Sequence, residues 1–155
     1  MVVTGSRKEA VRWQLTIRKI IAERKYSIDT LVAFSGEVFD PESAPNPVSE
    51  KSPLLNPTLK GRDTGDAFKE GDYAILLVAN KFQTGYDLPI LCGMYVDKRL
   101  SGIQAVQTLS RLNRAYPGKD TTYIVDFVNN QDEILSAFKK YYETAELEGI
   151  SDPVR

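Results

Sequence analysis

The sequence predicts an α/β domain with an open parallel sheet of about five strands and helices on both faces. Two observations favour this fold class. Short apolar runs rich in β-branched residues alternate with longer segments in which apolar residues recur at helical spacing. The first strand–helix–strand repeat is complete within about 35 residues, a length typical of a βαβ unit, and such units imply parallel strands.

The first three predicted elements make up this unit. Residues 1–4 (MVVT) form a short buried strand, and Ser6 with Glu9 has the S-x-x-E pattern of a capping box that begins a helix. Apolar residues then follow helical spacing to about Lys25. Residues 29–34 (DTLVAF) form the next strand and are followed directly by a Ser-Gly pair.

The segment 36–63 interrupts the pattern. It holds Pro41, Pro45, Pro47, Pro53 and Pro57 and has almost no periodicity. It is longer than most loops, so we interpret it as either a functional excursion or a partly disordered insertion. A helical turn is expected soon afterwards, at residues 66–70.

Three further strands are predicted in the second half of the chain. Residues 73–79 (YAILLVA) form the most apolar run and are expected to be a central strand. The polar, glycine-containing segment 80–89 is a loop after that strand. Residues 90–96, which include Gly93, and residues 121–128 (TTYIVDFV) form the last two strands.

Two more helices are predicted here. Ser101 to Gln104 has the capping pattern S-x-x-Q and begins a helix that extends to residue 114 and ends at a Tyr-Pro-Gly sequence. Asn130 with Glu133 caps the final helix. The expected apolar face of that final helix consists of Ile134, Phe138, Tyr141 and Ala145.

Composition bounds the domain organisation and the chemistry. The 155 residues are 42% hydrophobic, which suits one domain at residues 1–147 followed by a flexible tail at 148–155. The formal charge of −1 means that nucleic-acid contact would come from a local patch. There is no histidine, and the single cysteine, Cys92, lies in an apolar run and is expected to pack in the core, so a metal site is not expected. Without a membrane-length apolar run or a signal peptide, we expect a soluble cytoplasmic domain.

The helix around residues 107–114 (QTLSRLNR) carries the most distinctive polar face. Gln107, Arg111 and Arg114 fall within about 60° of one another on a helical projection, with Gln104 beside them. Guanidinium groups suit planar, multi-oxygen anions such as phosphate. From this helix alone, a solvated polar face is an equally good interpretation. The opposite, apolar face consists of Ala105, Val106, Leu109 and Leu112.

Polar residues also follow several predicted strands. In open parallel sheets, ligands bind beyond the carboxyl ends of the strands, so we expect these segments to line one edge. The segments are residues 5–7, 35–36, 80–87 and the approach to the helix at 101–114.

The candidate residues indicate charge stabilisation and backbone contact. Arg111 and Arg114 are suited to stabilise charge on a transferring phosphoryl group. Asp87, two residues after Gly85, would accept hydrogen bonds from sugar hydroxyls, although spacing alone favours a turn aspartate that caps its own loop. Other residues are of types that bind a nucleic-acid backbone, with helix capping or loop structure as the alternative: Ser6, Arg7, Ser35, Asn80 and Lys81.

Other phosphate-binding patterns are missing from the sequence. There is no G-x-x-x-x-G-K-[ST] loop, no acidic pair after a strand, and no G-x-G-x-x-G fingerprint. The chain therefore has residues to complete a nucleotide site but not to build one alone.

The motifs resemble those of superfamily 2 helicases. Residues 107–114 are similar to motif VI, Q-x-x-G-R-x-G-R, with Ser110 and Asn113 in place of its two glycines. Residues 79–89 (ANKFQTGYDLP) resemble motif V, and residues 2–10 (VVTGSRKEA), with the later LVAFSG, resemble motif IV and the strand that follows it. This order is that of the second RecA-like lobe, a P-loop NTPase-type lobe that lacks the P-loop.

A more specific resemblance covers residues 2 to 143. VANKFQTGYDLP, MYVDKRLSGIQAVQTLSRLNRAYPGK and DFVNN together look like the R subunit of type I restriction–modification enzymes. In that family the R subunit is an ATP-dependent DNA translocase with a separate nuclease domain, and it works with methylase and specificity subunits. The resemblance therefore implies ATP and Mg²⁺, held mainly by a first lobe, and double-stranded DNA as partner.

The resemblance also implies roles for individual residues. Arg111 and Arg114 would reach the γ-phosphate of ATP, and Gln107 would couple ATP to movement at the lobe interface. Gly85 and Asp87 would lie near the nucleotide. The residues implied at the DNA backbone are Ser6, Arg7, Gly36 and Asn80, to which the adjacent Lys81 is added by residue type.

We expect this chain to have negligible ATPase, translocase or nuclease activity by itself, because the phosphate and metal ligands are not in it. Two alternatives stay open. The chain could be the second lobe of another superfamily 2 helicase or remodeller, against which the KFQTGYDLP block argues. It could also be a non-catalytic α/β module that binds a nucleotide or a protein, against which the glycine-poor first strand–helix turn argues.

Overall fold

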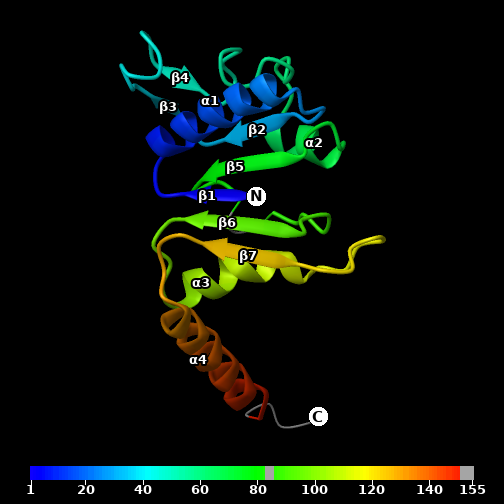
Figure 1. Ribbon diagram of the computed structural model, residues 1–155. Coiled ribbons are helices and arrows are strands. Elements are labelled where there is room, and N and C mark those ends of the chain that lie inside the picture. The colour runs from blue at the N-terminus through cyan, green and yellow to red at the C-terminus, as the bar shows by residue number, and fades with distance from the viewer. Residues whose placement is uncertain (83–85, 151–155) are drawn as a thin grey trace.

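A computed structural model describes residues 1–82 and 86–150 of the chain. Its main sheet has five strands, and every neighbouring pair is parallel (Figure 1). The predicted fold class, an open parallel α/β sheet, is therefore confirmed. In spatial order the strands are β2 (Thr30–Ala33), β5 (Ile75–Ala79), β1 (Val2–Thr4), β6 (Gly93–Asp97) and β7 (Tyr123–Asp126).

The first strand, β1, lies at the centre of the sheet, and β5 lies beside it. Val3 is fully buried and is aligned with Val78 on one side and Val96 on the other. The predicted βαβ unit is present, but β5 lies between its two strands, β1 and β2. The most apolar run was expected to be a central strand, and β5 is indeed flanked by strands on both sides.

Both faces of the sheet carry helices. Successive residues of a strand point to opposite sides of the sheet, so alternate side chains pack in two separate cores. Val2 and Leu77 pack with residues of helix α1 (Arg7–Arg24) on one face. Val3 and Val78 belong to the core on the other face, which includes residues of α2 (Thr64–Lys69) and α3 (Gly102–Leu109). Helix α4 (Gln131–Ile150) packs against α3.

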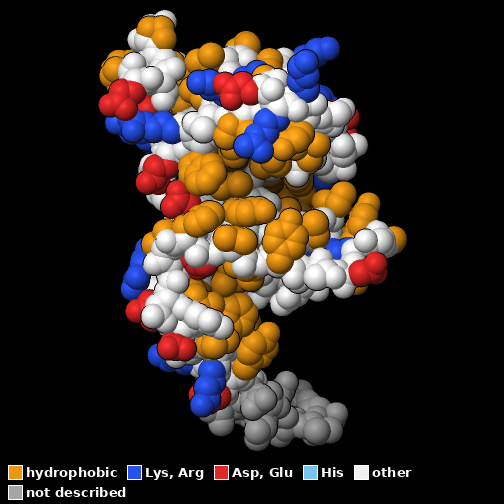
Figure 2. Space-filling model, viewed as in Figure 1, with side chains coloured by type: hydrophobic (Ala, Val, Ile, Leu, Met, Phe, Trp, Pro, Cys, Tyr) orange, Lys and Arg blue, Asp and Glu red, His pale blue; other side chains and the backbone are white. Residues whose placement is uncertain are grey.

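The α1 face is only partly covered. Helix α1 contacts β1, β2 and β5, whereas side chains of β6 and β7 on this face stay open, and Figure 2 shows hydrophobic atoms gathered there. The Tyr123 ring lies over Gly93, where an added Cβ would come within 2.6 Å of its Cζ. An apolar hollow of about 620 Å³ lies between this surface and α1. Within the described part of the chain, no helix is long and apolar enough to cross a membrane.

The helix boundaries correct two sequence expectations at α3. The helix begins after Ser101 as expected, but the Ser101 side chain makes no capping hydrogen bond, because Gly102 enters the helix with a left-handed φ of 54°. The α-helix ends at Leu109 and continues as a tighter 3₁₀ turn, η1 (Ser110–Asn113), rather than as one α-helix to residue 114. By contrast, Ser6 caps α1 as predicted and accepts a hydrogen bond from the Glu9 amide at 3.2 Å.

Helix α4 begins as predicted but extends away from the sheet (Figure 1). The Asn130 side chain accepts a hydrogen bond from the Asp132 amide at 2.8 Å, and Ile134 and Phe138 pack against the core. The expected apolar face is wrong beyond this point: Tyr141 is 43% exposed and Ala145 is also exposed. Only the first turns of α4 reach the core, so a longer apolar face has nothing to pack on.

The proline-rich segment 36–63 is irregular but anchored. It contains a short antiparallel hairpin of β3 (Glu37–Val38) and β4 (Val48–Ser49). The buried Asn56 side chain donates to the Val32 carbonyl at 2.8 Å and accepts from the Val32 amide at 3.0 Å. The Asn56 side chain therefore satisfies the backbone hydrogen-bonding groups at the free edge of β2, where another strand would otherwise pair. The segment is thus an ordered excursion rather than a disordered one.

Replacing Leu109, which is 4% exposed on α3, with alanine should lower the free energy of unfolding by roughly 2–5 kcal/mol, because it leaves a cavity between helix and sheet. Urea denaturation of the purified chain measures the change. Leu135→Ala on α4 is the matched control, because Leu135 is 58% exposed. Equal losses for the two variants would contradict the helix orientation described here.

Candidate functional site

The predicted Gln107, Arg111 and Arg114 gather with Asp87 around one hollow of about 410 Å³. We call this hollow the arginine pocket. Gly85, also predicted near a nucleotide, lies outside the described residues. The full lining of the arginine pocket is Tyr86, Asp87, Leu88, Gln107, Ser110, Arg111 and Arg114.

The apolar side of α3 determines where the arginines point. The apolar side of α3 and the adjacent Thr108 are buried. Gln104 and Gln107 therefore stay exposed on the other side of the helix, as the periodicity predicted. The 3₁₀ turn then ends in Arg114, whose backbone is extended with φ −75° and ψ 130°. The predicted apolar residues Ala105, Val106, Leu109 and Leu112 are each no more than 4% exposed.

Arg111 is hydrogen-bonded to the loop that forms the other side of the arginine pocket. Its guanidinium donates a hydrogen bond to the backbone carbonyl of Tyr86, the residue directly before Asp87 in the loop. Burial lowers the pKa of Arg111, while the Asp87 carboxylate raises it and the neighbouring Arg114 lowers it further. Arg111 therefore has a structural contact in addition to its predicted role.

Arg114 is more open than Arg111. Its Nε lies 3.4 Å from Asp87 Oδ1, and the two side chains are 68% and 62% exposed. A pair this exposed is screened by water and contributes little to stability. An anion that enters the pocket can therefore compete with Asp87 for this guanidinium at small cost. Whether Asp87 binds a sugar hydroxyl stays a prediction.

Tyr86 anchors the loop, and the sequence analysis did not single it out. Its hydroxyl donates to the Gly65 carbonyl of α2, and its ring stacks on Phe82 with centroids 4.2 Å apart. Burial raises the pKa of Tyr86 to about 12, with Asp63 and Asp66 adding to the effect. The only sequence signal was an aromatic residue between the glycine and aspartate of a polar loop.

A second hollow, of about 420 Å³, lies at the carboxyl ends of β1, β2 and β5. We call it the carboxyl-edge cleft. Three of the four predicted polar segments meet here, but Asp87 and the arginines do not line it. The expectation of one shared edge is therefore wrong for Asp87, which lines the arginine pocket instead. The cleft is lined by Gly5, Ser6, Arg7, Ser35, Ala79, Asn80 and Lys81.

Arg7 and Asn80 are held by neighbouring strand ends. Arg7 Nη1 donates to the Ser35 carbonyl at 3.2 Å, and a Cβ added at Gly36, where φ is 75°, would lie 3.0 Å from that nitrogen. Asn80 accepts a hydrogen bond from Lys98 Nζ at 2.6 Å. Burial lowers the pKa of Lys98. The sequence analysis did not identify Lys98, although its position directly after β6 was a usable signal.

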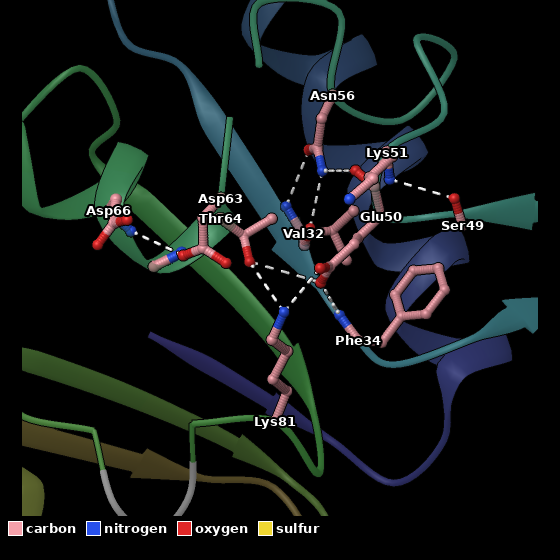
Figure 3. A network of polar contacts seen from close by, with 11 residues as sticks. Val32, Phe34, Ser49, Glu50, Lys51, Asn56, Asp63, Thr64, Asp66 and Lys81 are labelled. Atoms are coloured by element: carbon pink, nitrogen blue, oxygen red, sulfur yellow. Dashed lines mark hydrogen bonds and ion pairs between the residues drawn. The ribbon is translucent and has the colours of Figure 1, made fainter. Parts of the chain in front are cut away.

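Lys81 lines the cleft, and its side chain reaches toward Glu50 of the 36–63 segment (Figure 3). Its ammonium lies 2.6 Å from Glu50 Oε1 and donates to Thr64 Oγ1 at 3.1 Å. The other Glu50 oxygen accepts from the Phe34 amide at 2.9 Å. Lys81 and Glu50 are only 22% and 13% exposed, so this pair connects the insertion, α2 and the loop after β5. The DNA contact predicted for Lys81 stays a prediction, and it would compete with Glu50.

Among the described residues, no group of three or more His, Cys, Asp or Glu side chains is arranged to hold a metal ion.

Comparison with known proteins finds a family that matches the part of the chain around the arginine pocket. Residues 58–129, which contain the whole arginine pocket, match the family described as type I restriction enzyme subunit R domain 3. Nearly half of the chain thus matches this family. This confirms the resemblance to type I R subunits that the sequence motifs indicated, and it places the chain in the region of the C-terminal helicase lobe.

Individual relatives agree with this assignment. A putative type I restriction enzyme MjaIXP endonuclease subunit from Methanocaldococcus jannaschii is 29% identical over 153 residues, which is 98% of this chain and 14% of that protein. The MjaVIIP endonuclease subunit of the same organism is 39% identical over 74 residues, or 48% of this chain and 7% of that protein. The type I restriction enzyme HindI endonuclease subunit of Haemophilus influenzae is 30% identical over 83 residues, or 52% of this chain and 7% of that protein. The chain thus spans at most 14% of the length of these relatives.

Glu50→Ala should lower the free energy of unfolding by about 1–3 kcal/mol, because it removes the carboxylate partner of Lys81 and leaves the Phe34 amide without its acceptor. Urea denaturation measures this change. The matched control is Glu23→Ala, because Glu23 also pairs with a lysine, Lys19, but is 61% exposed. Adding Lys81→Met to Glu50→Ala should recover part of the loss. A loss no larger than that of Glu23→Ala would contradict the anchoring role of Glu50.

Proposed function

We propose that this chain is the second RecA-like lobe of the ATP-dependent DNA translocase motor in a type I restriction enzyme R subunit. In this role it supplies arginine side chains to a composite ATP site and backbone contacts to DNA. The observation that supports this proposal best is the arginine pocket, where Gln107, Arg111 and Arg114 gather within a domain of that family.

The hydrogen-bond donors of the arginine pocket suit a transferring phosphoryl group. The pocket offers two guanidinium groups and an amide, and none of these is a nucleophile or exchanges protons near neutral pH. Arg114 is exposed and loosely paired, so it is the side chain that reaches across to the γ-phosphate. Arg111, which is bound to the Tyr86 carbonyl, shapes the pocket and adds charge.

ATP and Mg²⁺ would be held mainly by the first lobe, because this sequence has no G-x-x-x-x-G-K-[ST] loop. When bound there, they supply the phosphoryl group and the neutralising cation. This chain contributes donors for the charge that develops on that group, with Gln107 at the interface between the lobes and Asp87 beside the nucleotide. We therefore expect the chain to be inactive without a first lobe.

The carboxyl-edge cleft suits the DNA backbone. It combines the Arg7 guanidinium with the amino end of the 18-residue helix α1, where Ser6 is the cap. Helix amino ends and arginine side chains both favour phosphate. Asn80 adds an amide, and Gly36 lets Arg7 approach the chain closely. Contacts of this kind fix the position of a motor on DNA without reading its sequence.

The wider assembly follows from the same proposal. The relatives are named endonuclease subunits of type I restriction enzymes. We infer that the complete subunit adds a nuclease domain and works in the cytoplasm with methylase and specificity subunits on double-stranded DNA. The specificity subunit would then recognise the target sequence.

ATP hydrolysis in the presence of double-stranded DNA tests the proposal. The measurement is made on this chain alone and on the chain joined to a first RecA-like lobe. Activity only in the joined protein would support a lobe that completes a neighbour's site. Activity in the isolated chain would instead favour a self-sufficient nucleotide-binding module and would reject the proposal.

Arg114→Ala in the complete R subunit should lower ATP turnover on the order of 10³-fold or more, because one donor to the developing charge is lost. Folding should be nearly unchanged, since the side chain is 68% exposed. Steady-state turnover and a thermal melt are measured together. Arg24→Ala, at the exposed end of α1, is the control and should leave turnover unchanged. Normal turnover in Arg114→Ala would reject its assignment to the ATP site.

Arg7→Ala in the complete subunit should weaken binding to all DNA sequences alike. The slope of log affinity against log salt concentration should become shallower by about one, because one phosphate contact is lost. Fluorescence anisotropy over a range of salt concentrations measures the slope. Lys19→Ala is a control cation on the same helix, at 76% side-chain exposure. A slope identical to that of the unmodified subunit would exclude Arg7 from the DNA contact.

A further inference from the structure

We propose that Lys119 is a positioning residue that sets the distance between the two walls of the arginine pocket. This inference rests on the proposed function, because it gives Lys119 a role in ATP turnover through Arg114. Lys119 is the last residue of a sequence block that carries the family resemblance, but the sequence analysis gave it no chemical role. It does not line the pocket itself.

The Lys119 ammonium is surrounded by backbone carbonyls from both walls. It donates to the carbonyls of Leu112 at 2.8 Å and Arg114 at 2.7 Å, at the end of the 3₁₀ turn. It also donates to the Pro89 carbonyl at 3.0 Å, two residues after Asp87. An ammonium group has three N–H donors, so these three carbonyls satisfy it. One side chain therefore joins the turn that carries Arg114 to the loop that carries Asp87.

The Lys119 ammonium takes the place of the donors that a further helical turn would supply. The last carbonyls of a helix have no partner within the helix, and a lysine side chain can satisfy them. Here the chain leaves the 3₁₀ turn at Arg114 in an extended conformation, so no further turn can do so. Without Lys119, the backbone at Arg114 would lose its tie to the loop at Pro89, and the guanidinium could shift relative to the pocket.

A tight turn brings Lys119 back to this position. The Lys119 amide donates to the Tyr116 carbonyl at 3.0 Å, and Gly118 adopts a φ of 80° that other residues rarely take. The turn folds the chain toward the end of η1 before β7 begins. Arginine is a poor substitute for Lys119, because its planar fork presents donors in one plane rather than toward three converging carbonyls.

The test uses the complete R subunit with its partner subunits, ATP and double-stranded DNA. Lys119→Met should lower kcat for ATP about tenfold to a hundredfold, because a small misplacement of a catalytic group is costly. The KM for ATP should stay within about twofold, since the first lobe holds most of the nucleotide under the proposed function. Lys119→Arg, which keeps the charge and should fold, is expected to lose turnover as well. The control is Lys139→Met on α4, where the lysine side chain is 78% exposed.

A double-mutant cycle separates positioning from stability. If Lys119 acts through Arg114, then Lys119→Met should cause no further loss of kcat in an Arg114→Ala background. Thermal melts of the same four proteins show the folded fraction. A loss of kcat that is equal in both backgrounds, or that follows the folded fraction, would overturn the inference.

The two proposals can fail separately. Reduced turnover in Arg114→Ala with normal turnover in Lys119→Met and Lys119→Arg would overturn the role of Lys119 and leave the proposed function in place. Normal turnover in Arg114→Ala would overturn the proposed function, and the inference on Lys119 with it.

Discussion

The parallel register of the central strand with its two neighbours determines where the carboxyl-edge cleft forms. Thr4 at the end of β1 is aligned with Ala79 of β5 and Asp97 of β6. The Thr4 hydroxyl adds a hydrogen bond to the Val78 carbonyl at 2.9 Å in the buried interior. Because the three strands end at the same level, the polar residues that follow them meet at one edge, as the contact between Asn80 and Lys98 demonstrates.

The arginine pocket depends on a different constraint, the burial of one side of α3. That side packs on the sheet, and the remaining side faces the loop before β6. The loop is held from two directions, by the Tyr86 hydroxyl on Gly65 and by Arg111 on the Tyr86 carbonyl. The loop is therefore held by backbone carbonyls that accept hydrogen bonds from side chains. Such hydrogen bonds fix the position of the loop without requiring a particular residue at the acceptor.

Periodicity and strand order predicted the fold and much of the candidate site because both depend on local pattern. The helical spacing correctly placed Gln107 and Arg111 on the side away from the core, and the apolar runs located every strand of the main sheet. The contacts of Glu50 with Lys81 and of Lys119 with Pro89 join residues about 30 positions apart, and no local pattern encodes them. The 3₁₀ turn was missed for the same reason, since Lys119 satisfies its last carbonyls from outside the helix.

One short segment connects the two sites. Residues 80–89 begin in the carboxyl-edge cleft, at Asn80, and reach the arginine pocket at Asp87. At one end Lys81 is fixed to Glu50, and near the other end the Pro89 carbonyl is fixed to Lys119. Under the proposed function, a motor must transmit its nucleotide state to its grip on DNA, and Asn80 and Asp87 place these two sites only seven positions apart in the chain.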